Sequence, residues 1–329
     1  MTYVLGVDGG GSKTFALVAD ERGRLLGFGR GGPSNHQSAG LEAAMASIAQ
    51  AAREAIDRAG IDPREIAVVS AGLSGADLPE DFALLQPALE RLELGVRVDL
   101  RNDTQVALRA GTHASWGVVL ICGSGVNAAG RAPDGREVVF PALGWISGDW
   151  GGGGSLATEM VRLVMREDDG RGPPTLLTSL LLDALGQPAA FELMRALYHK
   201  QIVHAQLVRC VPLLFRAALE GDQPSQQMII RLGEEMGGWA AAVIQRLDLA
   251  ALPVEVVLGG SVFKGEGPLL LDTLTQTIHR TAPHAILVRP AFEPVVGAVL
   301  LGLEATGVVV DDRVYETLRA TMPGVTSDA

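Results

Sequence analysis

The sequence predicts an α/β fold made of two mixed β-sheets with helices on their faces. Three observations support this prediction. Short β-prone segments alternate with longer segments whose apolar residues recur at helical spacing. A pattern of strand, glycine-rich turn and strand opens the chain and is repeated from Val118. Many of the 41 glycines also cluster after predicted strands, where the backbone can approach a ligand closely.

The first third of the chain predicts elements in the order β-β-β-α-β-α-β-α. A turn containing Gly23 joins the second and third strands as a hairpin. Gly60, followed by Pro63, ends the first helix. The predicted elements are strands at 3–8, 14–19 and 25–29, helix 41–58, strand 66–70, helix 82–92, strand 96–100 and helix 104–110.

The second part of the chain repeats the opening and then becomes mostly helical. Its predicted elements are strands at 118–122, 126–131 and 137–140, a helical segment at 155–247, strand 254–258, helix 269–280, strand 285–288 and helix 295–305. We therefore expect a first lobe at 1–116, a second lobe with a helical insertion at 117–294, a helix near 295–306 that packs back on the first lobe, and a loosely packed tail at 308–329.

Composition excludes several classes of protein. The 38 acidic and 27 basic residues give a net charge of −11, so we expect neither nucleic acid nor a membrane as a partner. Cys122 and Cys210 are too few for a disulfide framework or a zinc site, and the six histidines are scattered. The chain begins without a signal-peptide pattern and has no apolar run of about 20 residues. These features predict a soluble, cytoplasmic protein.

The first glycine turn predicts a phosphate-binding site. Its backbone amides can point at phosphate oxygens, and its hydroxyl and ammonium groups can add donors. Asp8 precedes the turn at a strand end, where a carboxylate can hold hydrated Mg²⁺. A strand follows the turn, so it is neither a P-loop nor a dinucleotide fingerprint. The alternative is a plain hairpin turn with an exposed aspartate. The turn consists of Gly9, Gly10, Gly11, Ser12, Lys13 and Thr14.

Two further glycine turns follow predicted strands later in the chain. Gly123-Ser124-Gly125 repeats the hydroxyl-bearing turn of the first half, and we expect it to contact phosphate as well. Gly259-Gly260-Ser261 could pack on a nucleoside or its α-phosphate. The alternative for this last turn is a simple connection from strand to helix.

Two polar segments could bind and activate an alcohol. Asn102-Asp103 ends a strand, and a carboxylate there can accept a proton from a hydroxyl group. The alternative is that Asp103 merely caps the helix that follows. Further on, Gly144, Trp145 and Asp149 suit a polyol, since carboxylates bind hydroxyls and indole rings cover apolar sugar faces. The alternative there is a glycine-rich loop with structural tryptophans.

In this order, these motifs resemble the sugar kinase and actin superfamily. Within it the chain most resembles the N-acetylglucosamine kinase-like group, the BadF/BadG/BcrA/BcrD ATPase family. The resemblance implies two actin-like, ribonuclease H-like lobes with a nucleotide cleft between them, and ATP and Mg²⁺ as cofactors. It covers nearly the whole chain, from 3 to 305, through the segments 6–14, 33–36, 102–103, 122–127, 144–149 and 258–264.

The resemblance also implies roles for individual residues. Asp103 would be the base that faces the sugar hydroxyl, and Asp8 would hold the metal. The glycine turns would bind ATP, with Ser12 and Ser124 at its phosphates and Gly260 and Ser261 at its adenosine. The residues implied for the sugar pocket are Asn35, Asn102, Asp103, Asn127, Gly144, Trp145 and Asp149.

The chain departs from the family at the sugar loop. Members commonly carry Gly-Asp-Glu-Gly-Ser there, whereas this chain has Trp150 after Asp149 and then four glycines. Leu143 and Trp145 stand where N-acetylglucosamine kinases tend to have Trp and His. These differences concern the choice of sugar and leave the phosphate turns intact.

The leading hypothesis is an ATP-dependent kinase that phosphorylates N-acetylglucosamine or glucosamine at its primary hydroxyl. Related kinases are often dimers, so a homodimer is one expected state. A second hypothesis is an ATP-driven activator of a dehydratase, whose relatives hold an iron–sulfur cluster with cysteine motifs that this chain lacks. A third is a non-catalytic sugar sensor on the same fold.

Overall fold

The computed structural model describes residues 2–322, which fold into two compact units. The first unit contains the chain up to Val119, the segment Ala129–Pro141 and the chain from Val288. The second unit contains Leu120–Ala128 and Ala142–Leu287. Two mixed five-stranded sheets with flanking helices are present, which confirms the predicted fold class.

The first sheet has the strand order β3-β2-β1-β4-β5. Strand β1 pairs antiparallel with β2 and parallel with β4, and β4 pairs parallel with β5. The carboxyl ends of three parallel strands therefore lie at one edge, and the first glycine turn and Asn102-Asp103 lie there too. The strands are β1 (Tyr3–Gly9), β2 (Thr14–Asp20), β3 (Leu25–Gly31), β4 (Ile66–Leu73) and β5 (Arg97–Asn102).

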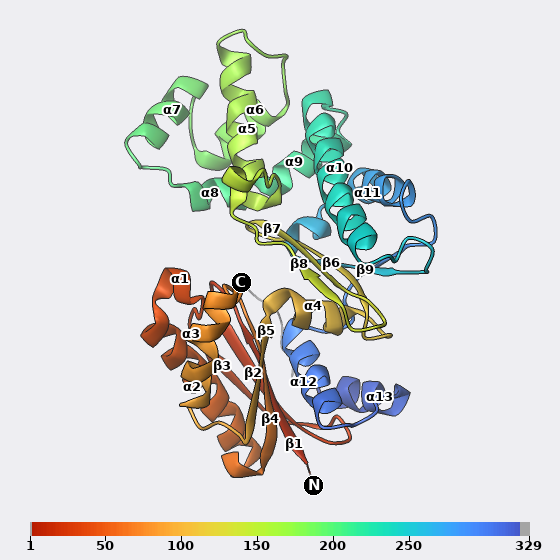
Figure 1. Ribbon diagram of the computed structural model, residues 1–329. Coiled ribbons are helices and arrows are strands. Elements are labelled where there is room, and N and C mark those ends of the chain that lie inside the picture. Colours follow the sequence, from red (N-terminus) through yellow and green to blue (C-terminus); the bar gives the residue numbers. More distant parts are fainter. Residues whose placement is uncertain (1, 323–329) are drawn as a thin grey trace. The chain divides into compact units, whose positions relative to one another are not determined.

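Helices cover both faces of this sheet because its strands bury apolar residues on both sides. Along β1, Leu5 and Val7 belong to one core, whereas Val4 belongs to the other. The first core packs on α2 (Leu41–Ala59) and α3 (Pro79–Glu90), and the second on α12 (Pro294–Ala305) and α13 (Asp312–Thr321). Figure 1 shows α2 and α3 in orange on one side of the sheet and α12 and α13 in blue on the other.

Helix α13 corrects the expectation of a loosely packed tail. Val314, Tyr315 and Leu318 are buried in the second core, and Arg109 donates to the Tyr315 hydroxyl at 2.7 Å. These three residues recur at helical spacing. The sequence analysis overlooked this spacing because it placed the end of the folded domain at the preceding helix. The rest of the predicted tail, 323–329, lies outside the described residues.

Strand β3 carries glycine at every second position, which lets α2 lie directly on the sheet. A Cβ at Gly29 would stand 1.9 Å from the Ala51 carbonyl oxygen, and one at Gly27 would stand 1.9 Å from that of Ala55. Since successive side chains of a strand alternate between faces, these glycines line one face. Backbone is the colliding partner, so no side chain can yield to make room.

Gly29→Ala should therefore lower the free energy of unfolding by about 1–3 kcal/mol, the usual cost of overpacking a core. Urea unfolding measures this loss. Gly238→Ala, in helix α10 (Gln223–Arg246), is the matched control because a Cβ there meets open space. It should leave stability unchanged or raise it by up to about 1 kcal/mol. Equal stability of the Gly29→Ala variant and the native chain would contradict the packing argument.

The second sheet has the order β10-β9-β6-β7-β8. Read from β8 to β10 and numbered within its own half, this is the same order as in the first sheet: third, second, first, fourth and fifth. The predicted repeat is thus confirmed at the level of topology. The strands are β6 (Gly117–Cys122), β7 (Val126–Arg131), β8 (Glu137–Val139), β9 (Glu255–Gly259) and β10 (Ile286–Val288).

Helices account for most of the second unit. They are α5 (Gly152–Asp168), α6 (Leu177–Leu185), α7 (Ala190–Tyr198), α8 (His204–Arg209), α9 (Val211–Leu219), α10 and α11 (Leu269–His279). The first unit also holds α4 (Asp103–Gly111), which was predicted. It also holds the short helix α1 (His36–Ala39), which the sequence analysis missed. Within the described part of the chain, every helix is too short or too polar to cross a membrane.

Candidate functional site

The first glycine turn, 9–14, connects β1 to β2 in a tight hairpin. Gly10 N donates to the Lys13 carbonyl at 3.0 Å, and the side chains of Ser12 and Lys13 are exposed. Thr14 is fully buried, and its hydroxyl bonds Gly32 O at 2.7 Å and Ser34 Oγ at 2.8 Å. This geometry corrects the expected phosphate contact of the Thr14 hydroxyl and leaves Ser12 as the available hydroxyl of the turn.

Two neighbouring loops are bonded to the backbone of this turn. Gly9 O accepts from Ser74 N at 2.8 Å, and Gly10 O accepts from Ser34 N at 2.9 Å. A Cβ at Gly9 would stand 2.5 Å from Leu73 Cδ2 and from Ser34 Oγ. Glycine is needed here because the loops pack so closely that no side chain fits.

Asp8 and Asp103 lie in an acidic environment within the first unit. Burial, followed by the nearby charges of Asp103 and Glu293, raises the pKa of Asp8 to about 7, although Lys13 opposes this shift. Burial and the charge of Asp77 raise the pKa of Asp103 to about 6. Desolvated carboxylates grouped in this way favour a cation or a proton, and they are typical of functional sites.

Asn102, not Asp103, caps helix α4. Its Oδ1 accepts from Thr104 N at 3.0 Å and from the Thr104 hydroxyl, and its Nδ2 donates to Ala76 O at 3.1 Å and Asp77 Oδ1 at 2.8 Å. The side chain is 3% exposed and its hydrogen-bonding groups are all used, so none is left for a sugar. Capping by Asn102 leaves the carboxylate of Asp103, the first residue of α4, available for chemistry.

Asn35 caps α1 and touches the same region. Its Oδ1 accepts from Gln37 N at 2.9 Å, and its Nδ2 donates to Ser74 Oγ at 3.1 Å. An amide nitrogen carries two hydrogens, so the second can still reach a ligand. Ser74, the partner of Asn35, was not among the residues predicted for the site.

The residues around Asp8 fit a magnesium ion that arrives with a phosphate ligand. No cluster of three or more His, Cys, Asp or Glu side chains among residues 2–322 is arranged to hold a metal alone. Mg²⁺ commonly binds through one or two carboxylates, with phosphate oxygens and water completing its shell. Asp8 supplies such a carboxylate, and its pKa is raised by burial and then by the neighbouring charges of Asp103 and Glu293.

The second glycine turn, 123–125, holds the start of helix α5. Gly123 O accepts from Gly153 N at 2.7 Å, and Ser124 O accepts from Gly154 N at 2.9 Å. A Cβ at Gly152 would stand 2.6 Å from Gly125 O. The glycine run after Trp150 is therefore the start of a helix pressed against the turn, rather than a loop that precedes a helix at residue 155.

The third glycine turn packs on the second. Gly260 has a φ of +101°, and a Cβ there would stand 2.3 Å from Cys122 O. Both conditions require glycine. Ser261 follows with its side chain exposed, and the residues Ser261–Lys264 form a 3₁₀ turn before the predicted helix, which begins at Leu269.

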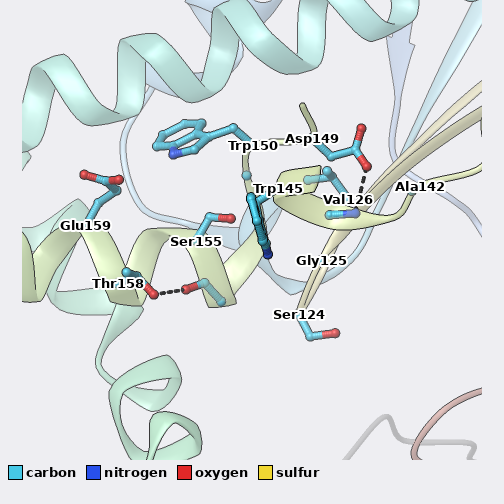
Figure 2. A pocket seen from close by; sticks show the side chains of 13 residues that line it. Ser124, Gly125, Val126, Ala142, Trp145, Asp149, Trp150, Ser155, Thr158 and Glu159 are labelled. Atoms are coloured by element: carbon cyan, nitrogen blue, oxygen red, sulfur yellow. Dashed lines mark hydrogen bonds between the residues drawn. The ribbon is translucent and has the colours of Figure 1, made fainter. Parts of the chain in front are cut away.

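A pocket of about 520 Å³ lies beside the second turn, within the second unit. Figure 2 shows Trp145, Asp149, Trp150, Ser155 and Glu159 around it. The full lining is Ser124, Gly125, Val126, Ala142, Gly144, Trp145, Asp149, Trp150, Gly151, Gly154, Ser155, Thr158 and Glu159. Three of the predicted sugar residues, Gly144, Trp145 and Asp149, thus share one pocket with a predicted phosphate turn.

Asp149 closes the loop that carries Trp145. Its Oδ2 accepts from Gly144 N at 2.9 Å and from Ser147 Oγ at 2.5 Å. Oδ1 has no protein partner among the described residues and can bind a ligand. The Trp145 ring is 86% exposed, so it is free to cover a sugar face.

The sequence analysis missed three lining residues on α5: Ser155, Thr158 and Glu159. Their spacing of three and four residues places them on one helix face. That face can be recognised as part of the pocket only when the helix is known to begin at the glycine run beside the second turn. Trp150 stacks under Arg231, whose Cζ is 3.9 Å from the ring centroid, and its buried Nε1 has no partner in the described chain. Asn127 Oδ1 accepts from Ala128 N at 2.7 Å, and the side chain is not among those lining the pocket.

Comparisons with known proteins agree with these features. A model of the BadF/BadG/BcrA/BcrD ATPase family matches residues 5–302. The N-acetylmuramic acid/N-acetylglucosamine kinase of Clostridium acetobutylicum is 25% identical over 301 residues, covering 92% of this chain and 98% of that protein. The N-acetyl-D-glucosamine kinase of Dictyostelium discoideum is 29% identical over 314 residues, with the same two coverages of 92% and 98%.

A solved structure also shares the fold. A crystal structure from Chromobacterium violaceum, 24% identical, superposes with a TM-score of 0.64 and covers 92% of this chain and 99% of that one. The family match spans the two glycine turns, the Asn102-Asp103 strand end and the third turn at 259–261. The chain belongs to the BadF/BadG/BcrA/BcrD ATPase family.

Proposed function

We propose that this chain transfers the terminal phosphoryl group of ATP to the primary hydroxyl of an amino sugar, N-acetylglucosamine or glucosamine. The observation that carries the proposal is Asp103: a half-buried carboxylate, in the first turn of a helix that Asn102 caps, at the sheet edge that bears the first glycine turn. The names of the two kinase relatives support a sugar as acceptor. Because the reaction consumes ATP, the proposed location is the cytoplasm.

Asp103 is the proposed general base. It accepts the proton of the sugar hydroxyl as that oxygen attacks the γ-phosphorus, and a pKa of about 6 leaves it ionised at neutral pH. In the first unit, the proposed phosphate ligands are main-chain amides of the turn at 9–14 and the Ser12 hydroxyl. In the second unit, the turn at 123–125 with the Ser124 hydroxyl is proposed to bind phosphate, and the turn at 259–261 to bind the nucleoside. Mg²⁺ held by Asp8 would neutralise charge on the phosphates.

The pocket in the second unit is the proposed acceptor pocket, and its charge favours a neutral or cationic substituent. Its described lining carries two carboxylates, Asp149 and Glu159, and no basic side chain. Arg162 pairs with Glu159 at 2.6 Å and offsets only that charge. An acidic substituent, such as a carboxylate-bearing ether on the sugar, would meet like charge at Asp149.

A coupled assay for ADP release over a panel of sugars tests the proposal. We expect turnover with N-acetylglucosamine or glucosamine, and little with N-acetylmuramic acid because of its carboxylate. Absence of sugar-stimulated ADP release with every hexose and amino sugar would overturn the proposal. Sugar binding without ATP turnover would identify a sensor instead.

The dehydratase-activator alternative is disfavoured by the environment of Cys122. Burial raises the pKa of its thiol to about 12, and iron–sulfur clusters need thiolates. Cys210 is also buried and unpaired with another cysteine. A colourless, iron-free preparation with sugar kinase activity would exclude this alternative.

The rate should depend on pH through Asp103. We expect kcat/KM for the sugar to be constant above about pH 6 and to fall about tenfold per unit below it, because acid protonates the base. The measurement uses saturating Mg²⁺ and ATP, so that the metal keeps Asp8 ionised. A profile that stays level down to pH 5 would contradict the assignment of Asp103 as base.

A further inference from the structure

We propose that Arg30 is a phosphate-binding residue, which forms with Lys13 a cationic clamp for the terminal phosphate of ATP beside the first glycine turn. This inference rests on the proposed function, because its ligand is the ATP that the kinase reaction consumes. Lys13 belongs to the glycine turn and was expected near phosphate. Neither the sequence motifs nor the comparisons single out Arg30.

The register of the first sheet places Arg30 on the same face as Asp8. Asp8 of β1 pairs with Phe15 of β2, and Phe15 pairs with Arg30 of β3. Side chains of residues paired in this way lie on one face of a sheet. Neighbouring strands lie about 4.7–4.9 Å apart, so the α-carbons of Asp8 and Arg30 are about 10 Å apart. A phosphate group and an extended arginine side chain together can bridge this distance.

Two phenylalanine rings support both cations. The Lys13 ammonium nitrogen lies 4.8 Å from the centre of the Phe15 ring. The guanidinium carbon of Arg30 lies 5.5 Å from the centre of the same ring and 5.3 Å from that of Phe28. Phe15 is 6% exposed and belongs to the second core, so it is a rigid support. Cation–π contacts of this length orient a cation without neutralising its charge.

The charges of the clamp are available to an anion. The side chains of Lys13 and Arg30 are exposed, and neither forms an ion pair with a carboxylate among residues 2–322. Glu54 accepts from the main-chain N–H of Arg30 at 2.8 Å, but its carboxylate pairs with Arg58 at 2.6 Å. In a chain with a net charge of −11, two unpaired cations on one ring form a local site of positive potential.

The place of the clamp favours the terminal phosphate over the other two. The γ-phosphorus must lie within reach of the hydroxyl that Asp103 activates, and Asp103 follows β5 at the sheet edge that bears the glycine turn. Lys13 also acts on Asp8, the proposed metal ligand, since its charge lowers the pKa of that carboxyl. Negative charge spreads over the γ-phosphoryl oxygens during transfer, and the planar fork of an arginine can bind two of them.

Calorimetric titration with ATP and with ADP, each at saturating Mg²⁺ and without sugar, tests the clamp. Arg30→Gln should weaken ATP binding about 10- to 100-fold, as for loss of hydrogen bonds to a charged group, and ADP binding by less than about threefold. Arg30→Lys keeps the charge without the fork and should recover part of the loss. Arg22→Gln is the matched control. It removes the same charge from an exposed arginine at the other end of the β2–β3 hairpin, and ATP affinity should stay native.

Two results would overturn the proposal: native ATP affinity in Arg30→Gln, or equal losses of ATP and ADP affinity. Urea unfolding with the same midpoint as Arg22→Gln shows that the loss is local. If Arg30→Gln fails to fold, Arg30→Met replaces it, because methionine keeps an apolar stem over both rings; native ATP affinity of that variant would overturn the proposal equally. A native chain that binds ATP but lacks sugar-stimulated turnover would reject the kinase function alone, and selective loss of ATP affinity in Arg30→Gln would then still support the clamp. A native chain that binds no ATP would overturn both.

Discussion

Asp103→Asn should lower sugar-dependent turnover by about 100-fold or more while ATP still binds. Positioned general bases contribute roughly 10²- to 10⁴-fold to rate, and an amide cannot accept the proton of the sugar hydroxyl. The substitution keeps the shape of the side chain, and Asn102 continues to cap α4 through Thr104. Turnover is measured by coupled ADP release and ATP binding by calorimetry.

Asp99→Asn is the matched control for this experiment. Asp99 lies on the same strand, β5, pairs with Arg101 at 3.0 Å, and is not among the charges that shift the pKa of Asp8 or Asp103. Asp99→Asn should change turnover by less than about twofold, as expected for a partly exposed ion pair outside the site. Near-native turnover of Asp103→Asn would mean that Asp103 is not the base, and the mechanism proposed here would have to be given up.

The two readings of Asn102-Asp103 show where sequence reasoning stops. Both residues are good helix caps, but the sequence analysis considered only Asp103 as a cap, as the alternative to its role as base, and so did not divide the two roles between Asn102 and Asp103. The division depends on a shift of one residue in the start of α4, which is set by the bonds of Asn102 to Ala76 and Asp77. Those partners lie about 25 positions away in the sequence and only the fold brings them near.

The fold itself could be predicted further than the site. The strands of both halves, and the helices outside 155–247 other than α1 and α13, were predicted to within a few residues because their apolar spacing is regular. The repeated opening predicted the repeated strand order. The start of α5 was missed because glycine disfavours helices in isolation, whereas here packing against Gly125 requires it. The pocket residues on α5 were hidden for the same reason.

Sequence alone could not distinguish the glycines proposed to bind a ligand from the glycines that permit close packing. The run in β3 and the turn at 9–11 look alike as patterns, yet Gly29 faces the backbone of α2 while Gly11 has open space around its Cα. The close approach of α2 explains why position 29 is glycine. For Gly11, the proposed explanation is the close approach of a ligand.

Asp149→Ala should weaken sugar use by about 10- to 100-fold and leave ATP binding within about twofold. Its Oδ1 is free to bind sugar hydroxyls, and a lost hydrogen bond to a charged group accounts for a change of this size. The same substitution also releases Gly144 N and Ser147 Oγ from Oδ2, so the loop that carries Trp145 loses its closure. Sugar KM and calorimetric sugar affinity are the measurements.

Trp150→Ala is the companion experiment, because tryptophan stands where the family commonly has glutamate. The Trp150 ring stacks with Arg231, and its buried Nε1 has no hydrogen-bond partner among residues 2–322. Trp150→Phe keeps the ring for Arg231 and removes only the N–H, so it separates packing from ligand binding. If Asp149→Ala alone weakens sugar affinity, the sugar role implied by the family holds for Asp149. If Trp150→Ala and Trp150→Phe weaken it while Asp149→Ala does not, the pocket recognises its ligand through the indole N–H. An acceptor other than an amino sugar must then be sought.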